Sequence, residues 1–512
     1  MKRNHSNNDI DKKDKGKFGY GFIQLFQMFF RRIPSLLQYT ILTSRPAIDA
    51  IGNIRKYRHT DWGLLFTSSI LGIIIGLFVT LFHWSMTGAE QLFNNIHFTA
   101  ETVIPWQIIA FPLIPALGGL GIGVLRQTIF KGATVEGLES LVHALVHREG
   151  KIDWRNSFKA IIFAGLLIGS GGGAGREGPT IALGSSLGST FAQILRLKPQ
   201  QLRVLCGSGA AAAISAIFNA PLGGIVFALE AIIGGISIRA FAPLVISSVL
   251  ATATTRILVG NNPLLLAPEI TAVNLTDYLL LAIAGMLSGL VAVYYLKTYN
   301  GTAKIVEKTI RPFPEIWKPA VGGFFAGLIL MALPTMLETT YNPINHVISG
   351  NGLPLLQNSI FQNLTRHFTK ENLIFLFILI ASLTVIIKPV SNAISLVSSK
   401  AGGTMAPVLK TGAMFGFVLG SLLQFVFPDI SPGLFAIVCT GAVLAGTFQL
   451  PLAGGIILFE ICHNYDLILP LIFSSVFASF IVQKSGVTTF NPLQKEYVDD
   501  DEQIHPRLKI ND

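Results

Sequence analysis

Long apolar stretches constrain this chain more than any other feature of its sequence. They cover residues 62–86, 106–125, 278–295, 320–337, 373–387 and 467–482. Several approach the roughly 20 residues that an α-helix needs to span about 30 Å of hydrocarbon. Only 13% of the residues are charged, whereas soluble domains carry about 25%. The sequence therefore predicts an all-α integral membrane protein that crosses the lipid bilayer many times.

Glycine and proline interrupt many of these stretches, and the chain contains 50 glycines. Small residues let membrane helices approach one another closely. Irregular backbone at membrane depth is tolerated only where it is buried in protein or lines a cavity. This pattern favours a transporter or channel over a simple membrane anchor.

Positive charge is concentrated before the first long apolar stretch. Residues 1–60 hold twelve Lys and Arg residues against four Asp. Nucleic-acid binding is one interpretation, but the positive-inside rule accounts for basic residues beside membrane spans. We therefore expect no nucleic-acid partner and a multi-pass protein of the plasma (cell inner) membrane with a cytoplasmic N-terminus. Residues 2–17 lack the apolar core of a secretory signal, and residues 18–30 favour an amphipathic helix on the inner leaflet.

The predicted organisation has four parts. Residues 1–60 form a basic cytoplasmic segment, residues 61–270 and 271–495 form two membrane halves, and residues 496–512 form a short acidic tail. The three cysteines, Cys206, Cys439 and Cys462, lie in apolar stretches and are expected to be buried free thiols. No spacing is typical of a metal site and no catalytic constellation is present, so we expect no metal, no cofactor and no enzyme.

Two Gly-rich segments, 169–179 and 400–407, share a motif. Each ends at a proline, Pro179 or Pro407, and continues with the spacing Pro-x4-Gly-x3-Gly. Broken segments of duplicated transporter halves often meet at the substrate site near the membrane midplane. We therefore expect the site where these two segments meet.

A second pair of motifs follows in the same order. Pro221 precedes Glu230 by nine residues, and Pro451 precedes Glu460 by nine residues. Ordered repetition at nearly the same offset, about 230 residues, predicts an internal duplication. Duplicated membrane halves are often inverted relative to each other.

The first Gly-rich segment has the character of an anion site. A Gly-rich run that opens a helix presents backbone N–H groups and the positive end of the helix dipole to an anion. A nucleotide phosphate loop would need a preceding strand or a following Gly-Lys-Ser/Thr, and neither is present. Close helix packing explains the glycines but not the two charged residues among them.

Those charged residues are Arg176 and Glu177. A charge at the membrane centre is unfavourable by about 2.5–3.5 kcal/mol, so such residues are functional hypotheses by default. Desolvation favours a neutral carboxylic acid, so Glu177 is expected to exchange protons. Its carboxylate would compete with an anion for one helix N-terminus, which makes Glu177 a candidate gate and proton carrier.

These residues carry a resemblance to a known family. The run Gly175-Arg176-Glu177-Gly178-Pro179 resembles the GREGP motif of the CLC family of chloride channels and chloride/proton exchangers. The run GGTMAP at 402–407 resembles the family's GGxFxP segment, and the resemblance extends over residues 60–495. It implies a CLC-like inverted repeat of about 18 helical segments, many short or broken. It also implies a homodimer of the bacterial type, without C-terminal regulatory domains, and one anion pathway per subunit.

By the same resemblance, the anion-binding residues are Arg176, Gly178, Ala133, Thr404, Met405 and Phe490. Ala133 stands where the family has a chloride-coordinating serine, and Phe490 where it has a coordinating tyrosine. Met405 replaces a phenylalanine but keeps its backbone N–H. The central site is therefore expected to rest on backbone amides.

The inner proton-accepting glutamate of the exchangers corresponds to Ala231. The preceding Glu230 is then the candidate inner proton site, although Glu230 and Glu460 have a plainer interpretation as water-facing or structurally hydrogen-bonded residues. Lys388 and Lys410 flank the second Gly-rich segment. They either attract anions at an inner mouth or extend to lipid headgroups.

The resemblance implies transmembrane chloride transport through a glutamate-gated pathway, channel-like or weakly proton-coupled. Two alternatives stay open: a stoichiometric chloride/proton antiporter and a fluoride-preferring family member. The expected partners are chloride or other small anions, protons, the lipid bilayer and a second copy of the chain.

Overall fold

A computed structural model describes residues 60–97, 105–130, 141, 144–145, 150–234, 238–266, 275–333, 341–350, 355 and 370–490. The chain divides into two units, Met1–Gly63 and Leu64–Asp512. The predictions for residues 1–59, for Ala133 and for the tail 496–512 lie outside the described residues.

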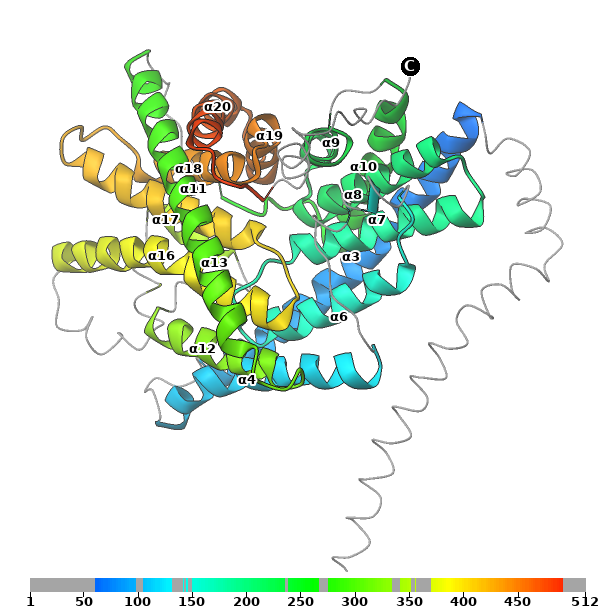
Figure 1. The fold of residues 1–512 in the computed structure, drawn as a ribbon. Helices are drawn as coiled ribbons and strands as arrows, with labels where there is room; N and C mark the ends of the chain where they lie inside the picture. Colours follow the sequence, from blue (N-terminus) through cyan, green and yellow to red (C-terminus); the bar gives the residue numbers. More distant parts are fainter. Residues whose placement is uncertain are drawn as a thin grey trace, which may run out of the picture. The chain divides into compact units, whose positions relative to one another are not determined.

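Helices make up nearly all of the described chain, which confirms the predicted all-α class (Figure 1). Among these residues, the single β-type pairing is an isolated bridge between Gly175 and Gly403. The helices are α3 (Asp61–His97), α4 (Pro105–Thr128), α6 (Trp154–Gly169), α7 (Glu177–Ile194), α8 (Pro199–Phe218), α9 (Pro221–Ala228), the π-helical turn η1 (Leu229–Ile233), α10 (Ile238–Val259), α11 (Leu275–Ile310), α12 (Lys318–Ala332), α13 (Asn342–Ile348), α16 (Lys370–Ser399), α17 (Met405–Gln424), α18 (Pro432–Phe448), α19 (Pro451–Cys462), the 3-10 turn η3 (Tyr465–Leu467) and α20 (Ile468–Ser485).

Seven of the described helices are long and apolar enough to cross a membrane. The apolar stretches predicted from sequence coincide with α3, α4, α11, α12, α16 and α20. The stretches do not include the spans in α8, α10 and α17, because Gly, Ala, Ser and Thr dilute their apolar character. The multi-pass prediction is confirmed.

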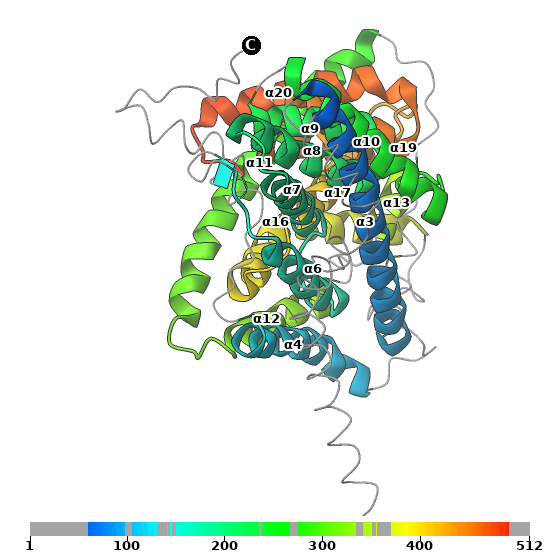
Figure 2. The ribbon, with the colours of Figure 1, turned by 90° about the vertical axis from the view of Figure 1, so that its right-hand side faces the viewer.

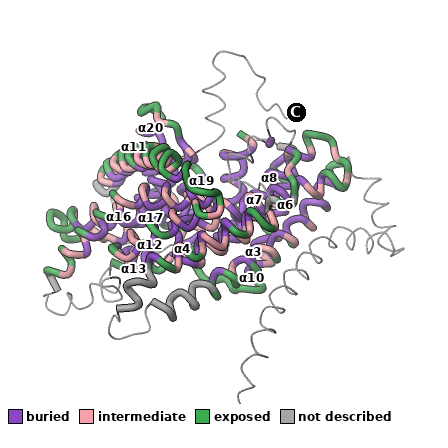
Figure 3. The backbone as a smooth tube through the Cα atoms, turned by 60° about the horizontal axis from the view of Figure 1, so that its bottom comes forward, coloured by how far each residue is buried: buried purple, intermediate pink, exposed green. Residues whose placement is uncertain are grey.

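The spanning helices fall into an inner and an outer group (Figure 3). In α8 and α17, most residues of the apolar span are buried inside the protein, 89% and 72% respectively. In α3, α10, α11, α16 and α20 the buried share is between 39% and 50%. The outer helices therefore present apolar side chains to lipid, whereas α8 and α17 belong to the core.

The predicted duplication recurs in the packing of helix pairs. A Cβ on Gly188 of α7 would overlap the carbonyl oxygen of Leu205 in α8. A Cβ on Gly416 of α17 would overlap the carbonyl oxygen of Phe435 in α18 in the same way. The two repeated glycines thus give α7–α8 and α17–α18 the same close approach, as small residues do between membrane helices.

The two halves also cap each other's helices. The Glu230 carboxylate accepts hydrogen bonds from the two backbone N–H groups that follow Pro451 in α19, at 3.2 and 2.8 Å. The Glu460 carboxylate accepts from the two that follow Pro221 in α9, at 3.1 and 2.6 Å. Such reciprocal contacts are what a two-fold axis between the halves produces. Both glutamates therefore have the structural hydrogen bonds that the plainer interpretation expected.

A second close pairing brings α4 against α12, and the two helices lie side by side in both views (Figures 1 and 2). Cβ atoms on Gly119 and Gly323 would overlap the backbone of Pro319 and Pro115 respectively. The Arg126 guanidinium, near the end of α4, donates to the carbonyl oxygen of Ser399. This bond fixes the end of α16 just before the second Gly-rich segment.

All three cysteines are buried and free, as predicted.

Removing either reciprocal cap should destabilise the fold by a similar amount. Glu230→Ala and Glu460→Ala each leave two N-terminal amides without their carboxylate, and loss of an N-cap lowers stability by about 0.5–2 kcal/mol. Thermal unfolding in detergent measures this, with Glu307→Ala on the exposed face of α11 as the control. A melting temperature that falls for one variant but not for the other would contradict the reciprocal arrangement.

Candidate anion-binding site

The two Gly-rich segments meet, as the sequence predicts. The backbone N–H of Gly175 donates to the carbonyl oxygen of Gly403 at 2.7 Å, and the two residues form the isolated bridge. A Cβ on Gly403 would stand 2.9 Å from the Gly178 nitrogen. Only glycine fits this approach without displacing backbone.

Two helices begin directly beyond this junction, and neither is capped by the side chain of its own N-cap residue. The N-cap residue of α7 is Arg176 and that of α17 is Thr404, and neither side chain bonds to its helix. Threonine is a favoured N-cap residue because its hydroxyl usually accepts a hydrogen bond from the helix backbone. The Thr404 hydroxyl makes no such bond to α17. Uncapped N-terminal N–H groups and the positive end of the helix dipole form a ready anion site.

The Glu177 carboxylate lies at this junction and is completely buried. The hydroxyl of Tyr341 donates to its Oε1 at 2.5 Å. Its Oε2 is close to the position that a Cβ on Gly175 would occupy, and the Ala406 nitrogen is 3.0 Å from that same position. The side chain that opens α7 therefore reaches from Tyr341 to the first turn of α17.

Arg176 supports this arrangement through the tyrosine ring. Its guanidinium lies over the Tyr341 ring, 4.7 Å from the ring centre, which is a favourable cation–π distance. Tyr341 is the residue before α13. Arg176 thus helps to hold the hydroxyl that binds Glu177, a role that the sequence did not suggest.

Polar side chains of α16 anchor the first Gly-rich segment. The Gly173 N–H donates to Ser395 Oγ at 3.1 Å, and the Asn392 amide donates to the Gly173 carbonyl at 2.9 Å. These bonds satisfy backbone groups that have no helical partner and that membrane burial would otherwise penalise. The junction is therefore held by a rigid helix.

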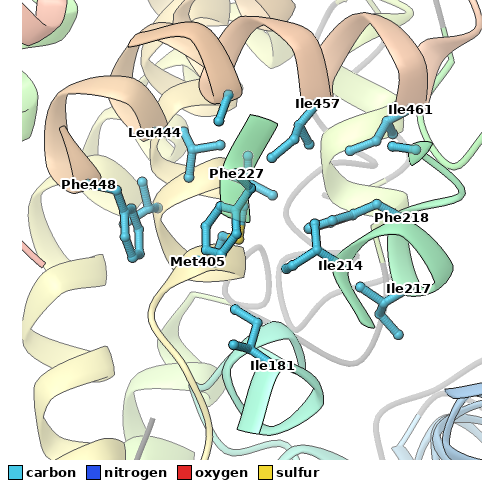
Figure 4. Packing of buried hydrophobic residues seen from close by; sticks show 14 of the residues in the cluster. Ile181, Ile214, Ile217, Phe218, Phe227, Met405, Leu444, Phe448, Ile457 and Ile461 are labelled. Carbon is cyan, nitrogen blue, oxygen red and sulfur yellow. The ribbon is translucent and has the colours of Figure 1, made fainter. Parts of the chain in front are cut away.

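An apolar cluster lies next to Met405, the first residue of α17 (Figure 4). Met405 is buried and lies near Phe227 and Phe448. The Phe448 ring also contacts Phe490, with ring centres 5.6 Å apart. The Phe490 ring packs edge-on against Tyr299 at 5.0 Å, and its N–H donates to the carbonyl oxygen of Thr447 at 3.0 Å.

The structure therefore brings together five predicted residues: Arg176, Glu177, Gly178, Thr404 and Met405. Phe490 belongs to the aromatic group beyond Phe448, Glu230 lies at the N-terminus of α19, and Ala133 is outside the described residues. The sequence did not predict Tyr341. It lies 164 residues from Glu177, and no motif or spacing links the two residues. Among the described residues, no three His, Cys, Asp or Glu side chains gather as metal ligands do.

Neither interpretation of Lys388 and Lys410 matches their position. Lys388 is 0% exposed and Lys410 is 1% exposed. A lysine that extends to headgroups keeps its ammonium in water, and a lysine at a channel mouth is solvated as well. Both are interior residues instead.

Comparisons with known proteins agree with this geometry. A family model described as Voltage gated chloride channel matches residues 118–483. The chain belongs to the CLC family. Similar CLC proteins include the H(+)/Cl(-) exchange transporter ClcA of Vibrio vulnificus, which is 29% identical over 86% of this chain and 90% of that protein. A putative chloride channel protein ClcB-like of Ralstonia nicotianae is 26% identical over 77% of this chain and 86% of that protein.

Solved CLC structures show the same fold. A slow cyanobacterial Cl-/H+ antiporter superposes with a TM-score of 0.69 at 20% identity, over 86% of this chain and 99% of that one. A CLC-type fluoride/proton antiporter superposes with a TM-score of 0.63 at 20% identity, over 86% and 97%. At this identity the likeness concerns the fold.

The glycine junction gives a direct test of this CLC site. Gly403→Ala places a methyl group against the Gly178 backbone, and such overpacking typically destabilises by about 1–3 kcal/mol. Gly301→Ala on α11 is the control, because a Cβ there meets nothing within 4 Å and alanine favours the helix. Thermal unfolding should show a loss for Gly403→Ala and no loss for the control. Equal stability of both variants would mean that the two segments are not tightly joined.

Proposed function

We propose that this CLC protein moves chloride across the membrane along a pathway gated by Glu177, as a channel or with weak proton coupling. The observation that carries the proposal is the Glu177 carboxylate at the junction of two uncapped helix N-termini. An ionised carboxylate is itself an anion, so it occupies the position that favours chloride.

Protonation provides the opening step. A charge-assisted hydrogen bond to a carboxylate is about twice as strong as a neutral one. Neutral Glu177 therefore binds the Tyr341 hydroxyl less tightly than the anion does. Its side chain then leaves the junction, and chloride takes its place.

Backbone N–H groups supply the chloride ligands in this proposal. The relevant amides are those of Gly178 and Met405, in the first turns of α7 and α17. Phe490 offers an apolar ring packed among aromatic neighbours. The anion is therefore recognised by its charge and by the helix dipoles, because the Phe490 side chain has no hydroxyl to donate.

Weak proton coupling is supported by the surroundings of Ala231. This residue is fully buried in the turn η1 and cannot carry a proton. The adjacent Glu230 carboxylate is engaged by two amides of α19. A group held in this way is a poor proton shuttle.

Two alternatives are retained, each for a specific reason. The relatives named H(+)/Cl(-) exchange transporters favour a stoichiometric antiporter, with Glu230 as the inner carrier. The likeness to a fluoride/proton antiporter, together with Ala133 in place of serine, favours a fluoride-preferring protein.

We further propose a homodimer in the plasma membrane with a cytoplasmic N-terminus. Exposed apolar residues beside the reciprocal caps support the dimer: Leu222 of α9 is 51% exposed and Leu452 of α19 is 46% exposed. The basic residues before α3 support the orientation.

The gate is tested by Glu177→Gln, which copies the neutral state and cannot titrate. Wild-type chloride efflux from liposomes should rise as the pH falls, because protonation removes the competing charge. The variant should conduct at all pH values with little pH dependence and without proton movement. A Glu307→Gln variant on the exposed face of α11 should keep the wild-type profile. If Glu177→Gln also keeps that profile at normal rates, Glu177 is not the gate.

Coupling is tested by imposing a chloride gradient on liposomes and recording both fluxes. Chloride should flow with little or no uphill proton movement, because the described residues next to Glu230 offer no further acid in η1. Robust stoichiometric pumping would favour the antiporter, and Glu230→Gln should then abolish it. Fluoride efflux measured in parallel separates the fluoride alternative.

A further inference from the structure

The hydrogen bond between Tyr341 and Glu177 is shorter than an ordinary bond between neutral groups. The Tyr341 oxygen lies 2.5 Å from Glu177 Oε1. Bonds from a hydroxyl to a neutral oxygen are mostly about 2.7–2.8 Å long, whereas those to an ionised oxygen shorten to about 2.5–2.7 Å. The geometry is therefore that of a hydroxyl donating to a carboxylate, which is the closed state of the proposed gate.

Two contacts fix the position of this hydroxyl, and the first is on the tyrosine ring. The Arg176 guanidinium lies over the ring face, 4.7 Å from its centre. A cation–π contact of this kind restricts the ring. Arg176 directly precedes Glu177 in the chain, so the same short segment presents the carboxylate and holds the ring that binds it.

The second contact fixes the backbone of Tyr341 to a part of the chain separate from α7. The Tyr341 carbonyl oxygen accepts from the Asn345 N–H in the first turn of α13, at 3.0 Å. The Asn345 Oδ1 atom accepts from the Leu266 N–H at 2.9 Å, and its side-chain amide donates to the Leu264 carbonyl oxygen at 3.4 Å. The Leu264 N–H in turn donates to the Ile461 carbonyl oxygen in α19, at 3.0 Å. The hydroxyl is therefore attached to the second half of the protein.

A donor held in this way favours one protonation state of its partner. A hydrogen bond to the charged form of a group stabilises that form. The Tyr341 hydroxyl therefore favours ionised Glu177, and with it the closed gate. Opening requires that this bond be given up together with the negative charge.

We propose that Tyr341 is a latch that sets the pH at which the Glu177 gate opens. The proposal rests on the proposed function and deepens it. The latch stabilises the ionised, closed glutamate, so protonation and release require a lower pH than they would without the hydroxyl. Tyr341 is a positioning residue, because it acts through Glu177 and carries neither the proton nor the anion.

Other titratable side chains lie on neighbouring elements among the described residues. His83 of α3 interacts electrostatically with Arg176. His346 lies in the last turn of α13, and Lys388 and Lys410 are buried in α16 and α17. All of them remain in a variant that lacks only the latch hydroxyl. A change in the pH profile of that variant therefore reports the hydroxyl itself.

Chloride efflux from liposomes, measured from acidic to alkaline pH, tests the latch. Tyr341→Phe keeps the ring and removes the hydroxyl. Its midpoint pH of activation should rise by about one unit, because a hydrogen bond to a charged group exceeds one to a neutral group by roughly that much. An unchanged midpoint would overturn the proposal.

The matched control is Tyr294→Phe in α11. The Tyr294 hydroxyl also donates a hydrogen bond, to the carbonyl oxygen of Ile386 at 2.8 Å, and it lies away from the glycine junction. The control should keep the wild-type midpoint. An equal rise in both variants would mean that loss of any tyrosine hydroxyl has this effect, which also overturns the latch.

A double variant distinguishes a latch from general loosening of the site. In Glu177→Gln the titrating group is absent, so adding Tyr341→Phe should leave efflux as independent of pH as in Glu177→Gln alone. A pH dependence that appears only in the double variant would mean that Tyr341 acts on another group, and would refute the latch.

Infrared titration of the full-length protein in detergent separates the latch from the gate. The C=O band of protonated Glu177 is the band that Glu177→Gln lacks, and it reports ionisation without transport. In Tyr341→Phe this band should appear at a pH about one unit higher than in the wild type. A shifted band, with the wild-type efflux profile kept in Glu177→Gln, would sustain the hold of Tyr341 on Glu177 and refute the gate. Loss of pH dependence in Glu177→Gln, with the band unshifted in Tyr341→Phe, would sustain the gate and refute the latch.

Discussion

The hydrogen bond between Gly175 and Gly403 is the contact on which the rest of the site depends. Its own contribution is small, about 0.5–1.5 kcal/mol for a neutral pair. Its effect is geometric, because it joins the last extended residues of the two repeats and so fixes where α7 and α17 begin. A side chain on Gly403 would push Gly178 away. The α16 bonds to Gly173 then hold the junction against a rigid helix.

Carboxylates lie at helix N-termini in two different arrangements in this structure. At the periphery, Glu230 and Glu460 each engage two amides of the opposite half and close the ends of α19 and α9. At the centre, the N-cap side chains of α7 and α17 make no hydrogen bond to their own helices. Glu177 lies here in the first turn of α7, and its carboxylate accepts a hydrogen bond from the Tyr341 hydroxyl. A carboxylate attached at the helix start can leave without unpacking a helix, which suits a gate, whereas the reciprocal caps suit a scaffold.

Local patterns in the sequence were sufficient for the fold class and for the meeting of the two Gly-rich segments. The spacing around Pro179 and Pro407 revealed the duplication, and charge in an apolar region singled out Glu177. Contacts between distant segments were not predictable, as Tyr341 shows. The burial of Lys388 was predictable in principle, because Thr384, Asn392 and Ser395 share its helix face. Both interpretations of the sequence considered the charge of Lys388 without its polar neighbours on α16, and both therefore placed this lysine near water.

Release of the anion bears on why a carboxylate gate suits this chain. Conduction requires that an anion bind well enough to enter and weakly enough to leave. In the proposed function the anion is held by the backbone amides at the starts of α7 and α17, without a hydroxyl from Phe490. The returning Glu177 carboxylate brings a negative charge to the same junction and so displaces the anion. Gate closure and anion release are then one exchange of negative charge, driven by loss of a proton from a single side chain.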